Sequence, residues 1–273
     1  RTQFLGRDLR LPILLAPVGS LELFAQGAGA ASAQAAEQFG IAHMLSSVCQ
    51  PGIEAVAQAA PDALRLFQLY VHGDAAWVDA IAERVEAAGN GAFCLTVDTA
   101  HYSRRERDQA KRNIRRLAIP GREFQPRLTW KDVERLKTKL KIPLILKGIA
   151  TAEDAAMAVD HGVDMVYVSN HGGRQVAFGP PTIEALPAIA EAVAGRMTII
   201  LDSGIRRGAD ILRAKALGAD FAFAGRAFAY GVGAGGDEGA QRAFDILQLE
   251  LVRALGQLGV PSYESVGRSE LSN

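Results

Sequence analysis

The sequence predicts an α/β protein that folds as a single-domain (β/α)₈ TIM barrel, and three observations support this prediction. Short apolar runs alternate eight times with longer segments of helical periodicity, which is typical of a parallel sheet covered on both faces. Eight strand–helix units are the number that closes a barrel, and 273 residues fit one such domain. No composition shift or Pro/Ser-rich linker divides the chain.

The apolar runs that predict the strands are rich in Leu, Ile, Val and Phe. They cover Leu11–Pro17, Ala42–Val48, Leu64–Val71, Ala92–Asp98, Pro143–Gly148, Met165–Asn170, Thr198–Gly204 and Phe221–Arg226. The helical segments include Ala75–Ala88, Trp130–Leu140, Thr151–His161, Pro181–Ala194, Arg207–Leu217 and Glu238–Leu258. Helix-stop glycines follow several of them, for example Gly162. The long irregular stretch Thr99–Leu128 is rich in arginine, and a loop of that length inside a domain is usually functional or mobile.

The composition excludes several classes of partner. Lys+Arg and Asp+Glu are both 30, so the formal net charge is zero and neither nucleic acid nor an anionic membrane is expected as a partner. No apolar run approaches the roughly 20 residues of a membrane span, and no signal-peptide pattern is present. Cys49 and Cys94 form no CxxC pair and no metal-type cluster, so we expect buried free thiols, no metal and a cytoplasmic location.

Polar or glycine residues end every predicted strand. They are Pro17-Val18-Gly19, Ser46-Ser47, Gln68 with Tyr70, Thr96 with Asp98, Lys147, Ser169-Asn170-His171, Asp202-Ser203-Gly204 and Gly225-Arg226. The active sites of such barrels lie at the carboxyl ends of the strands. We therefore expect these residues to converge on one mouth.

The last two strand ends indicate a phosphate site. Glycine-containing turns with arginines lead into helices at Asp202–Gly208 and at Gly225-Arg226. Barrels commonly hold a phosphate at this place, on backbone N–H groups and a helix N-terminus. Arginine is electrostatically unfavourable at a helix N-terminus, so an anionic ligand explains Arg206 better than a solvated turn does.

The segment Ser169-Asn-His-Gly-Gly-Arg-Gln175 resembles the signature of the FMN-dependent 2-hydroxy acid oxidases and dehydrogenases, the family of glycolate oxidase, lactate oxidase and mandelate dehydrogenase. Further landmarks agree in order over nearly the whole chain. They are Ala16-Pro17, Leu45-Ser46-Ser47, Gln68-Leu69-Tyr70, Thr96-Val97-Asp98-Thr99, Arg104-Arg105-Glu106, Lys147-Gly148, Asp202-Ser203-Gly204 and Gly225-Arg226. The resemblance implies oxidation of a small L-2-hydroxy acid to the 2-oxo acid, with electrons passed to oxygen, a quinone or another carrier.

The resemblance also implies roles for individual residues. His171 would be the base and Asp98 its partner; Tyr70 would bind the substrate, and Arg174 and Arg105 would bind its carboxylate. Lys147 would lie at the N1–C2=O edge of the FMN ring and stabilise negative charge there. The remaining FMN contacts would come from Pro17, Val18, Gly19, Ser46, Gln68, Thr96, Ser169, Asp202, Ser203, Gly204, Arg206, Gly225 and Arg226.

Departures from the family pattern affect the expected substrate more than the expected cofactor. Members usually carry an N-terminal helical segment with a substrate-binding tyrosine, and this chain starts after that point, so the segment is expected to be missing from residues 1–273. The Thr99–Leu128 loop is also shorter than in typical members. Members are often tetramers, so a homo-oligomer, in the form of a homotetramer, is a further expectation.

Two alternatives remain open on the residues alone. Lys147 at a strand end is compatible with a Schiff-base aldolase, because burial can activate a lysine. A truncated scaffold that binds FMN but is inactive is the second alternative. Elsewhere, His43, His72 and His161 are interpreted as structural, and Gly231–Gly236, which matches GxGxxG, as a flexible connection into the last helix, because no strand–turn–helix–strand unit follows.

Overall fold

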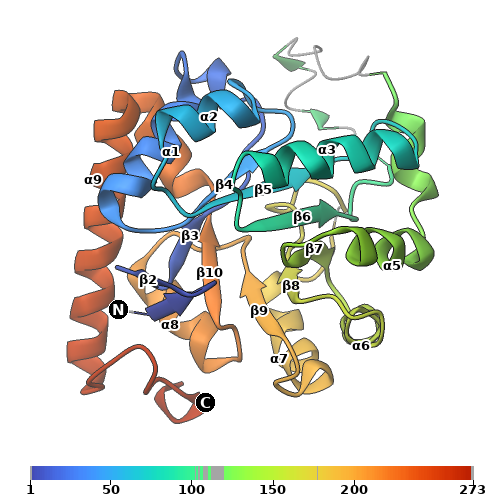
Figure 1. The fold of residues 1–273 in the computed structure, drawn as a ribbon. Helices are drawn as coiled ribbons and strands as arrows, with labels where there is room; N and C mark the ends of the chain where they lie inside the picture. The colour runs from blue at the N-terminus through green and yellow to red at the C-terminus, as the bar shows by residue number, and fades with distance from the viewer. Residues whose placement is uncertain are drawn as a thin grey trace.

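The computed structural model describes residues 2–101, 103, 105–106, 110–111, 120–176 and 178–271. Its centre is a closed parallel barrel, as predicted, with the strand order β10-β3-β4-β5-β6-β7-β8-β9 (Figure 1). The barrel strands are β3 Ile13–Leu15, β4 His43–Ser46, β5 Arg65–Leu69, β6 Ala92–Thr96, β7 Leu144–Ile149, β8 Met165–Val168, β9 Thr198–Leu201 and β10 Phe221–Ala224. Each lies inside its predicted run or within one residue of it, because the runs also include the polar residues that leave the sheet.

Helices cover the outside of the barrel (Figure 1). They are α1 Ala28–Phe39, α2 Ile53–Ala59, α3 Ala75–Ala87, α5 Trp130–Lys139, α6 Ala152–Asp160, α7 Thr182–Val193, α8 Gly208–Ala216 and α9 Arg226–Leu258, with 3-10 turns η1 Leu21–Leu23, η3 Arg122–Arg127 and η4 Arg268–Glu270. Of these, α1 and α2 belong to the eight predicted strand–helix units, but their bounds were not predicted. Among the described residues, no helix is long and apolar enough to cross a membrane.

The last helix differs from the prediction. It begins at Arg226, directly after β10, and its backbone is non-helical at Gly235 and Gly236, where two helical halves meet at a kink. A Cβ on Gly231 would lie 2.4 Å from the backbone oxygen of Gly239, so the two halves approach closely. The glycine-rich stretch is therefore a tight bend that needs glycine for close packing, rather than a loose connection.

An N-terminal hairpin closes the amino end of the barrel and was not predicted. Strands β1 Thr2–Phe4 and β2 Arg7–Leu9 pair antiparallel. The ring of Phe4 meets that of Phe221, at the start of β10, with centroids 4.7 Å apart. Phe4 belongs to the same buried cluster as the inward-facing strand residues. The hairpin thus seals the end of the barrel opposite the mouth.

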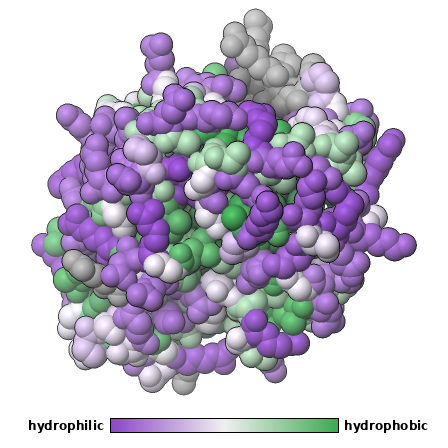
Figure 2. All heavy atoms as spheres, in the orientation of Figure 1, coloured by the Kyte–Doolittle hydropathy of each residue, from purple (hydrophilic) through white to green (hydrophobic). Residues whose placement is uncertain are grey.

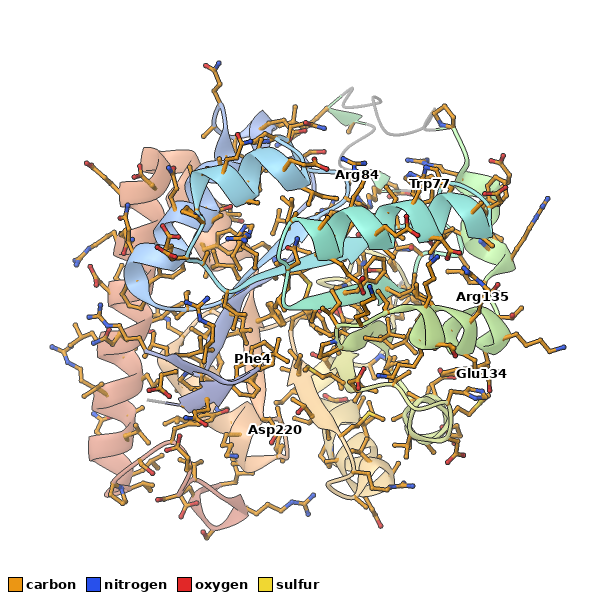
Figure 3. The ribbon with its side chains drawn as sticks, in the orientation of Figure 1. Phe4, Trp77, Arg84, Glu134, Arg135 and Asp220 are labelled. Carbon is orange, nitrogen blue, oxygen red and sulfur yellow. The ribbon has the colours of Figure 1, made fainter. Side chains whose placement is uncertain are left out.

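Outside the barrel, ion pairs link neighbouring helices (Figure 3). Arg84 pairs with Glu54 at 2.9 Å and Arg135 with Asp79 at 2.5 Å. The imidazole of His161 lies 3.0 Å from Glu134 and stacks near Trp130, which agrees with its structural interpretation. An exposed pair such as Arg84–Glu54 stabilises little by itself. Hydrophilic side chains cover most of the face in Figure 2, as expected for the outer faces of these helices.

Both cysteines are free and buried, as predicted. Burial raises the pKa of the Cys49 thiol to about 11, so the thiol stays protonated at neutral pH. Cys94 lies on the inward face of β6 and its pKa is raised further by the same cause.

Candidate active site

Strand alternation builds a ring of buried polar side chains at the mouth. Residues two apart on a strand face the same side, and the inward positions of the barrel form one apolar cluster that includes Met44, Leu66, Cys94, Ile145, Tyr167 and Ile200. Two residues further along each strand or just beyond it, the inward side chains become polar: Ser46, Gln68, Thr96, Lys147, Ser169 and Asp202. All are at most 9% exposed. The alternation of side chains along the strands therefore places these six polar residues in one layer on top of the apolar cluster. We call this polar layer the floor of the mouth.

Hydrogen bonds along this floor fix its side chains. The Ser46 hydroxyl donates to Gln68 Oε1 at 2.9 Å, and Gln68 Nε2 donates to Thr96 Oγ1 at 2.8 Å. Lys147 is 4% exposed, and its ammonium donates to Ser169 Oγ at 3.1 Å. Among the described residues, Ser169 is the one hydrogen-bond partner of this ammonium, so two of its three hydrogens are left for an acceptor above it.

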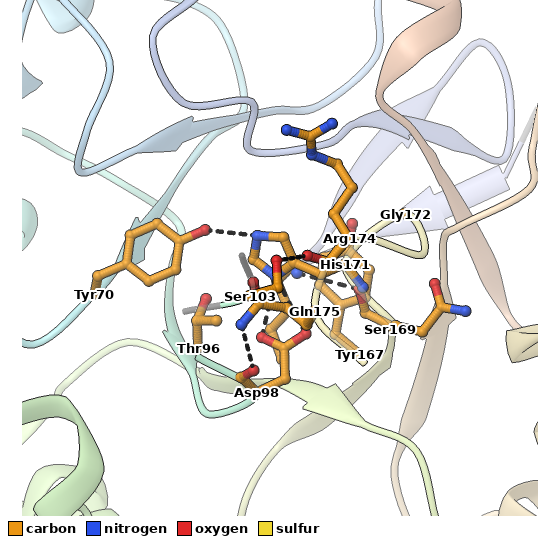
Figure 4. Close-up of polar contacts among 12 residues, drawn as sticks. Tyr70, Thr96, Asp98, Ser103, Tyr167, Ser169, His171, Gly172, Arg174 and Gln175 are labelled. Carbon is orange, nitrogen blue, oxygen red and sulfur yellow. Dashed lines mark hydrogen bonds and ion pairs between the residues drawn. The ribbon is translucent and has the colours of Figure 1, made fainter. Parts of the chain in front are cut away.

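Three side chains at the mouth form a hydrogen-bonded line (Figure 4). His171 Nδ1 lies 3.1 and 3.2 Å from the two oxygens of Asp98, and its Nε2 lies 3.1 Å from the Tyr70 hydroxyl. Because a carboxylate only accepts, Nδ1 carries the hydrogen and donates it. Nε2 then has a free lone pair that accepts from Tyr70. This arrangement suits His171 to accept a proton at Nε2.

Burial and charge keep this pair in the required protonation states. Burial, and next the Lys147 charge, lower the pKa of His171 below its ordinary value, while Asp98 opposes that shift. Burial alone would raise the pKa of Asp98, but Lys147 and the hydrogen bond from His171 lower it overall. At neutral pH the imidazole is therefore neutral and Asp98 is ionised, which is the pairing that a general base needs.

The backbone around His171 is strained. His171 has φ 60°, in the left-handed region that few non-glycine residues adopt, and its N–H donates to Ser169 Oγ at 3.1 Å. Gly148 makes room for Asp98, since a Cβ there would lie 2.6 Å from Asp98 Cβ and the glycine has φ 103°. Strained positions of this kind gather at functional sites, where the surroundings hold them.

The two arginines expected to bind a carboxylate lie on loops at the rim. Arg105 has φ 45° and is half-buried, and its guanidinium donates to Gln175 Oε1 at 3.4 Å. Arg174 is exposed and follows His171 on the same loop, and its carbonyl accepts a hydrogen bond from Ser103 (Figure 4). The two loops are joined next to Asp98, because Gln175 accepts a hydrogen bond from Arg105 and donates one to the Asp98 carbonyl. Arg104, quoted with the family landmarks, lies outside the described residues.

The two helix N-termini near the expected phosphate site differ. At α8, Asp210 accepts from the N–H groups of Arg206 and Arg207, and Glu250 accepts from that of Gly208. At α9, the N-cap is Gly225, and among the residues that the structure describes no side chain caps the first amides. An incoming anion therefore finds uncapped N–H groups at α9 rather than at α8. Arg226 is exposed there and donates to the Gly172 carbonyl at 3.2 Å.

The remaining predicted contacts lie around the same mouth. Pro17, Val18 and Gly19 are half-buried directly after β3. Ser203 has φ 70°, and its hydroxyl donates to Asp202 Oδ1 at 2.6 Å. Gly204 and Arg206 are exposed beyond β9.

Sequence reasoning assigned no role to three side chains that hold the site. Gln175 Nε2 donates to the carbonyls of Asp98 and His101, at 3.0 and 3.1 Å. Gln125, in η3, accepts from the Val71 N–H and donates to the Thr96 carbonyl, both at 2.7 Å. Tyr167 lies inside the barrel. Gln175 stood in the quoted signature, but the only sequence signal for Gln125 was the long loop itself.

The donor set of this mouth fits FMN. The buried Lys147 ammonium with hydrogens to spare suits the carbonyl-bearing edge of the isoalloxazine ring. The uncapped α9 amides with Arg226 suit the phosphate. Between them, the floor side chains and Asp202 offer the donors and acceptors that a ribityl chain needs.

Comparison with known proteins agrees with this assignment. The FMN-dependent dehydrogenase family matches residues 1–120 and 110–273. The chain is 36% identical to an L-lactate oxidase of Nostoc over 99% of its length and 82% of the relative's, and 34% identical to glycolate oxidase of Spinacia oleracea over 99% and 80%.

Solved structures show the same relationship. A mandelate oxidase superimposes with a TM-score of 0.89 at 33% identity, covering 97% of this chain and 80% of that one. The flavin-binding domain of baker's yeast flavocytochrome b2 gives 0.92 at 32% identity, covering 99% and 71%. With the fold, the mouth and these matches together, the chain belongs to the FMN-dependent dehydrogenase family and is an oxidoreductase that uses FMN.

Proposed function

We propose that this protein oxidises a small L-2-hydroxy acid to the corresponding 2-oxo acid. The observation that carries the proposal is the line from Tyr70 through His171 to Asp98, next to loops that bear Arg105 and Arg174. A base and carboxylate-binding arginines at one mouth are what a 2-hydroxy acid requires. The relatives named L-lactate oxidase, glycolate oxidase and (S)-2-hydroxyacid oxidase support the class of substrate and its handedness.

In this proposal His171 Nε2 accepts a proton from the substrate. Tyr70, which now donates to Nε2, turns to the hydroxyl or the carboxylate of the substrate when it binds. Asp98 keeps Nδ1 protonated and stabilises the imidazolium that forms. Bound FMN would accept the two electrons that the substrate loses when its hydroxyl carbon becomes the carbonyl of the 2-oxo acid.

Arg174 and Arg105 bind the substrate carboxylate. A guanidinium presents two parallel N–H donors that match the two oxygens of a carboxylate. Gln175 supports this arrangement because it joins Arg105 to the Asp98 and His101 carbonyls. The carboxylate thus orients the substrate with its hydroxyl carbon near His171.

The proposed FMN contacts divide between the floor and the open end. Lys147 would hold the N1–C2=O edge of the ring, and the ring and ribityl chain would be lined by Pro17, Val18, Gly19, Ser46, Gln68, Thr96 and Ser169. The ribityl chain and the phosphate would be held by Asp202, Ser203, Gly204, Arg206, Gly225 and Arg226. The uncapped α9 amides support Gly225 and Arg226 as the main phosphate contacts.

Further parts of the proposal concern the setting of the enzyme. Oxygen, a quinone or another carrier accepts the electrons; the relatives named oxidases favour oxygen. Residues 1–273 form one FMN-binding domain. A homo-oligomer such as a homotetramer is supported by Ile246, Leu249 and Val252, which are exposed apolar side chains on α9. A cytoplasmic location is supported by the buried free thiols.

The aldolase alternative has less support than the oxidase. Lys147 is held by Ser169 under the mouth and serves the cofactor end of the site. The inactive scaffold is distinguished by experiment. The purified protein is loaded with FMN and mixed without oxygen with a panel of L-2-hydroxy acids, and bleaching of the flavin spectrum by one of them is expected. A flavin spectrum that no L-2-hydroxy acid of the panel bleaches contradicts the proposed function.

A further inference from the structure

Tyr167 is a buried tyrosine that the proposed function does not use. It faces inward from β8, one layer below Ser169, and is 0% exposed. Its ring stacks on Phe223, with centroids 4.6 Å apart and an interplanar angle of 14°. A phenol in this apolar layer loses water at its hydroxyl, so a partner must compensate. The residues that contact Tyr167 therefore indicate why a hydroxyl group lies in this apolar layer.

The Tyr167 hydroxyl begins a line of hydrogen bonds that ends beside His171. It donates to Asp202 Oδ2 at 2.8 Å, while Oδ1 of the same carboxylate accepts from the Ser203 hydroxyl at 2.6 Å. Ser203 Oγ in turn accepts from the Gly172 N–H at 2.9 Å. Both oxygens of Asp202 therefore accept a hydrogen bond. The Ser203 hydroxyl is held in the one orientation in which it donates to Asp202 and accepts from the Gly172 N–H.

The segments at the end of this line are strained. Ser203 has φ 70° and His171 φ 60°, in the left-handed region that strains non-glycine residues, whereas the neighbouring Gly172 adopts φ 69° without this strain. Non-glycine residues in this region persist where surrounding contacts hold them. The bond from Gly172 to Ser203 is such a contact, because it ties the loop of His171 to the end of β9.

The ring of Tyr167 has a second, separate partner. Lys147 Nζ lies 5.2 Å from the ring centroid, which is the geometry of a cation–π interaction. The ring therefore supports the ammonium from below, while Ser169 accepts a hydrogen bond from it. One side chain thus touches both the floor lysine and the Asp202 carboxylate.

We infer that Tyr167 is a positioning residue with two separable roles. Its ring holds the Lys147 ammonium under the FMN site, and its hydroxyl fixes Asp202 so that Ser203 anchors the His171 loop. The kinetic part of this inference rests on the proposed function, whereas the cofactor part rests on FMN binding alone.

Two variants separate the roles. Tyr167→Phe keeps the ring and removes the hydroxyl, so the midpoint potential of the bound flavin should match the wild type. The dissociation constant for FMN should rise about tenfold, and flavin reduction by the hydroxy acid should slow by a similar factor with KM changing less. Tyr167→Met fills the space without the ring, so it should in addition shift the midpoint potential to a more negative value. Tyr167→Leu replaces the methionine variant if that variant does not fold.

Tyr263 provides a matched control. It is 7% exposed, its hydroxyl donates to the Asp220 carbonyl at 2.9 Å, and Lys215 Nζ lies 5.3 Å from its ring. Asp220 lies directly before β10, at the amino end of the barrel (Figure 3). Tyr263→Phe therefore loses a comparable buried hydroxyl far from the mouth. It should lower the melting temperature of the apoprotein but leave FMN affinity, midpoint potential and reduction rate unchanged.

The outcomes are distinct. If Tyr167→Phe has the same FMN affinity and reduction rate as Tyr263→Phe, the role of the hydroxyl is overturned. If neither Tyr167→Met nor its leucine replacement changes the midpoint potential, the role of the ring is overturned. Should no hydroxy acid reduce the wild type, the proposed function fails. In that case the inference about Tyr167 is still decided by two measurements that need no hydroxy acid. They are the affinity of the apoprotein for FMN and the midpoint potential of the bound flavin, which is obtained by titration with a chemical reductant.

Discussion

The floor and the rim of the mouth are built in different ways. The floor consists of inward side chains at the ends of barrel strands, such as Gln68, Thr96 and Lys147, which are buried and hydrogen-bonded to one another or to a neighbour. The rim consists of loop residues such as Arg105 and Arg174, which are half-buried or exposed. The floor is held by the sheet, and the rim by side-chain contacts between loops.

This difference indicates a division of labour. A floor fixed by strands provides a preformed site for the cofactor that all members of the family share. A rim made of loops can change without disturbing the barrel, so substrate choice can vary there. His171 stands at the boundary, since its ring contacts Asp98 and Tyr70 and its backbone N–H donates to the floor residue Ser169. Variants of the two regions should therefore fail in different ways.

The largest effect is expected at the boundary. His171→Ala removes the base at Nε2, so the rate of flavin reduction by the hydroxy acid should fall about 10²- to 10⁴-fold while FMN is retained. Stopped-flow reduction without oxygen measures the rate, and the visible spectrum after gel filtration measures FMN retention. His72→Ala, a half-buried histidine after β5, is the control and should reduce at the wild-type rate. Normal reduction in His171→Ala would show that another group is the base.

A rim variant should change substrate binding and leave the cofactor alone. Arg174→Lys keeps the charge but loses the two parallel donors, so kcat/KM should fall about 10- to 100-fold, mainly through KM, with unchanged FMN affinity. Steady-state kinetics with the best hydroxy acid measures this. Arg253→Lys, at an exposed position on α9, is the control. An Arg174→Lys enzyme with wild-type KM would remove Arg174 from the carboxylate site.

A variant at the phosphate end of the proposed cofactor site should show the reverse pattern. Arg226→Ala removes the exposed guanidinium at the uncapped start of α9, so the dissociation constant for FMN should rise about tenfold, as for loss of one charge-assisted contact. Fluorescence titration of the apoprotein measures it. Arg207→Ala, whose guanidinium pairs with Glu250 at 2.7 Å, tests the α8 start and should bind FMN normally. The opposite ranking of the two variants would place the phosphate at α8.

The smallest effect concerns pH. Because burial and Lys147 lower the pKa of His171 and the neutral form is the base, kcat/KM should be constant at neutral pH and fall as pH drops through that pKa, below the ordinary value of 6.5. Replacing Lys147 by Met removes a positive charge near the imidazole, so this acid limb should move to higher pH. If kcat/KM of Lys147→Met falls at the same acid pH as in the wild type, Lys147 and His171 are not electrostatically coupled.

The strands and the floor could be predicted from the sequence, whereas the course of α9 and the N-terminal hairpin could not. The eight strands, their closure and the residues of the floor followed from the sequence, because Ser46, Lys147 and Ser169 continue the inward period of their strands. The start of α9 and the bend at Gly235 and Gly236 did not follow, since close packing between Gly231 and Gly239 outweighs the low helix propensity of glycine there. The hairpin before β3 was missed because its strands are three residues each.

The sequence by itself determined which side chains reach the mouth. Side-chain alternation has a strict period of two, and parallel strands joined by helices bring all their carboxyl ends to one face. Only the tertiary structure decided which of these side chains meet. The contact of Tyr167 with Asp202 depends on the register that pairs Tyr167 with Ile200, and the contacts of Gln125 and Gln175 depend on how loops fold back over the strand ends. Such contacts join residues far apart in the chain, and no local pattern encodes the height at which neighbouring strands are staggered.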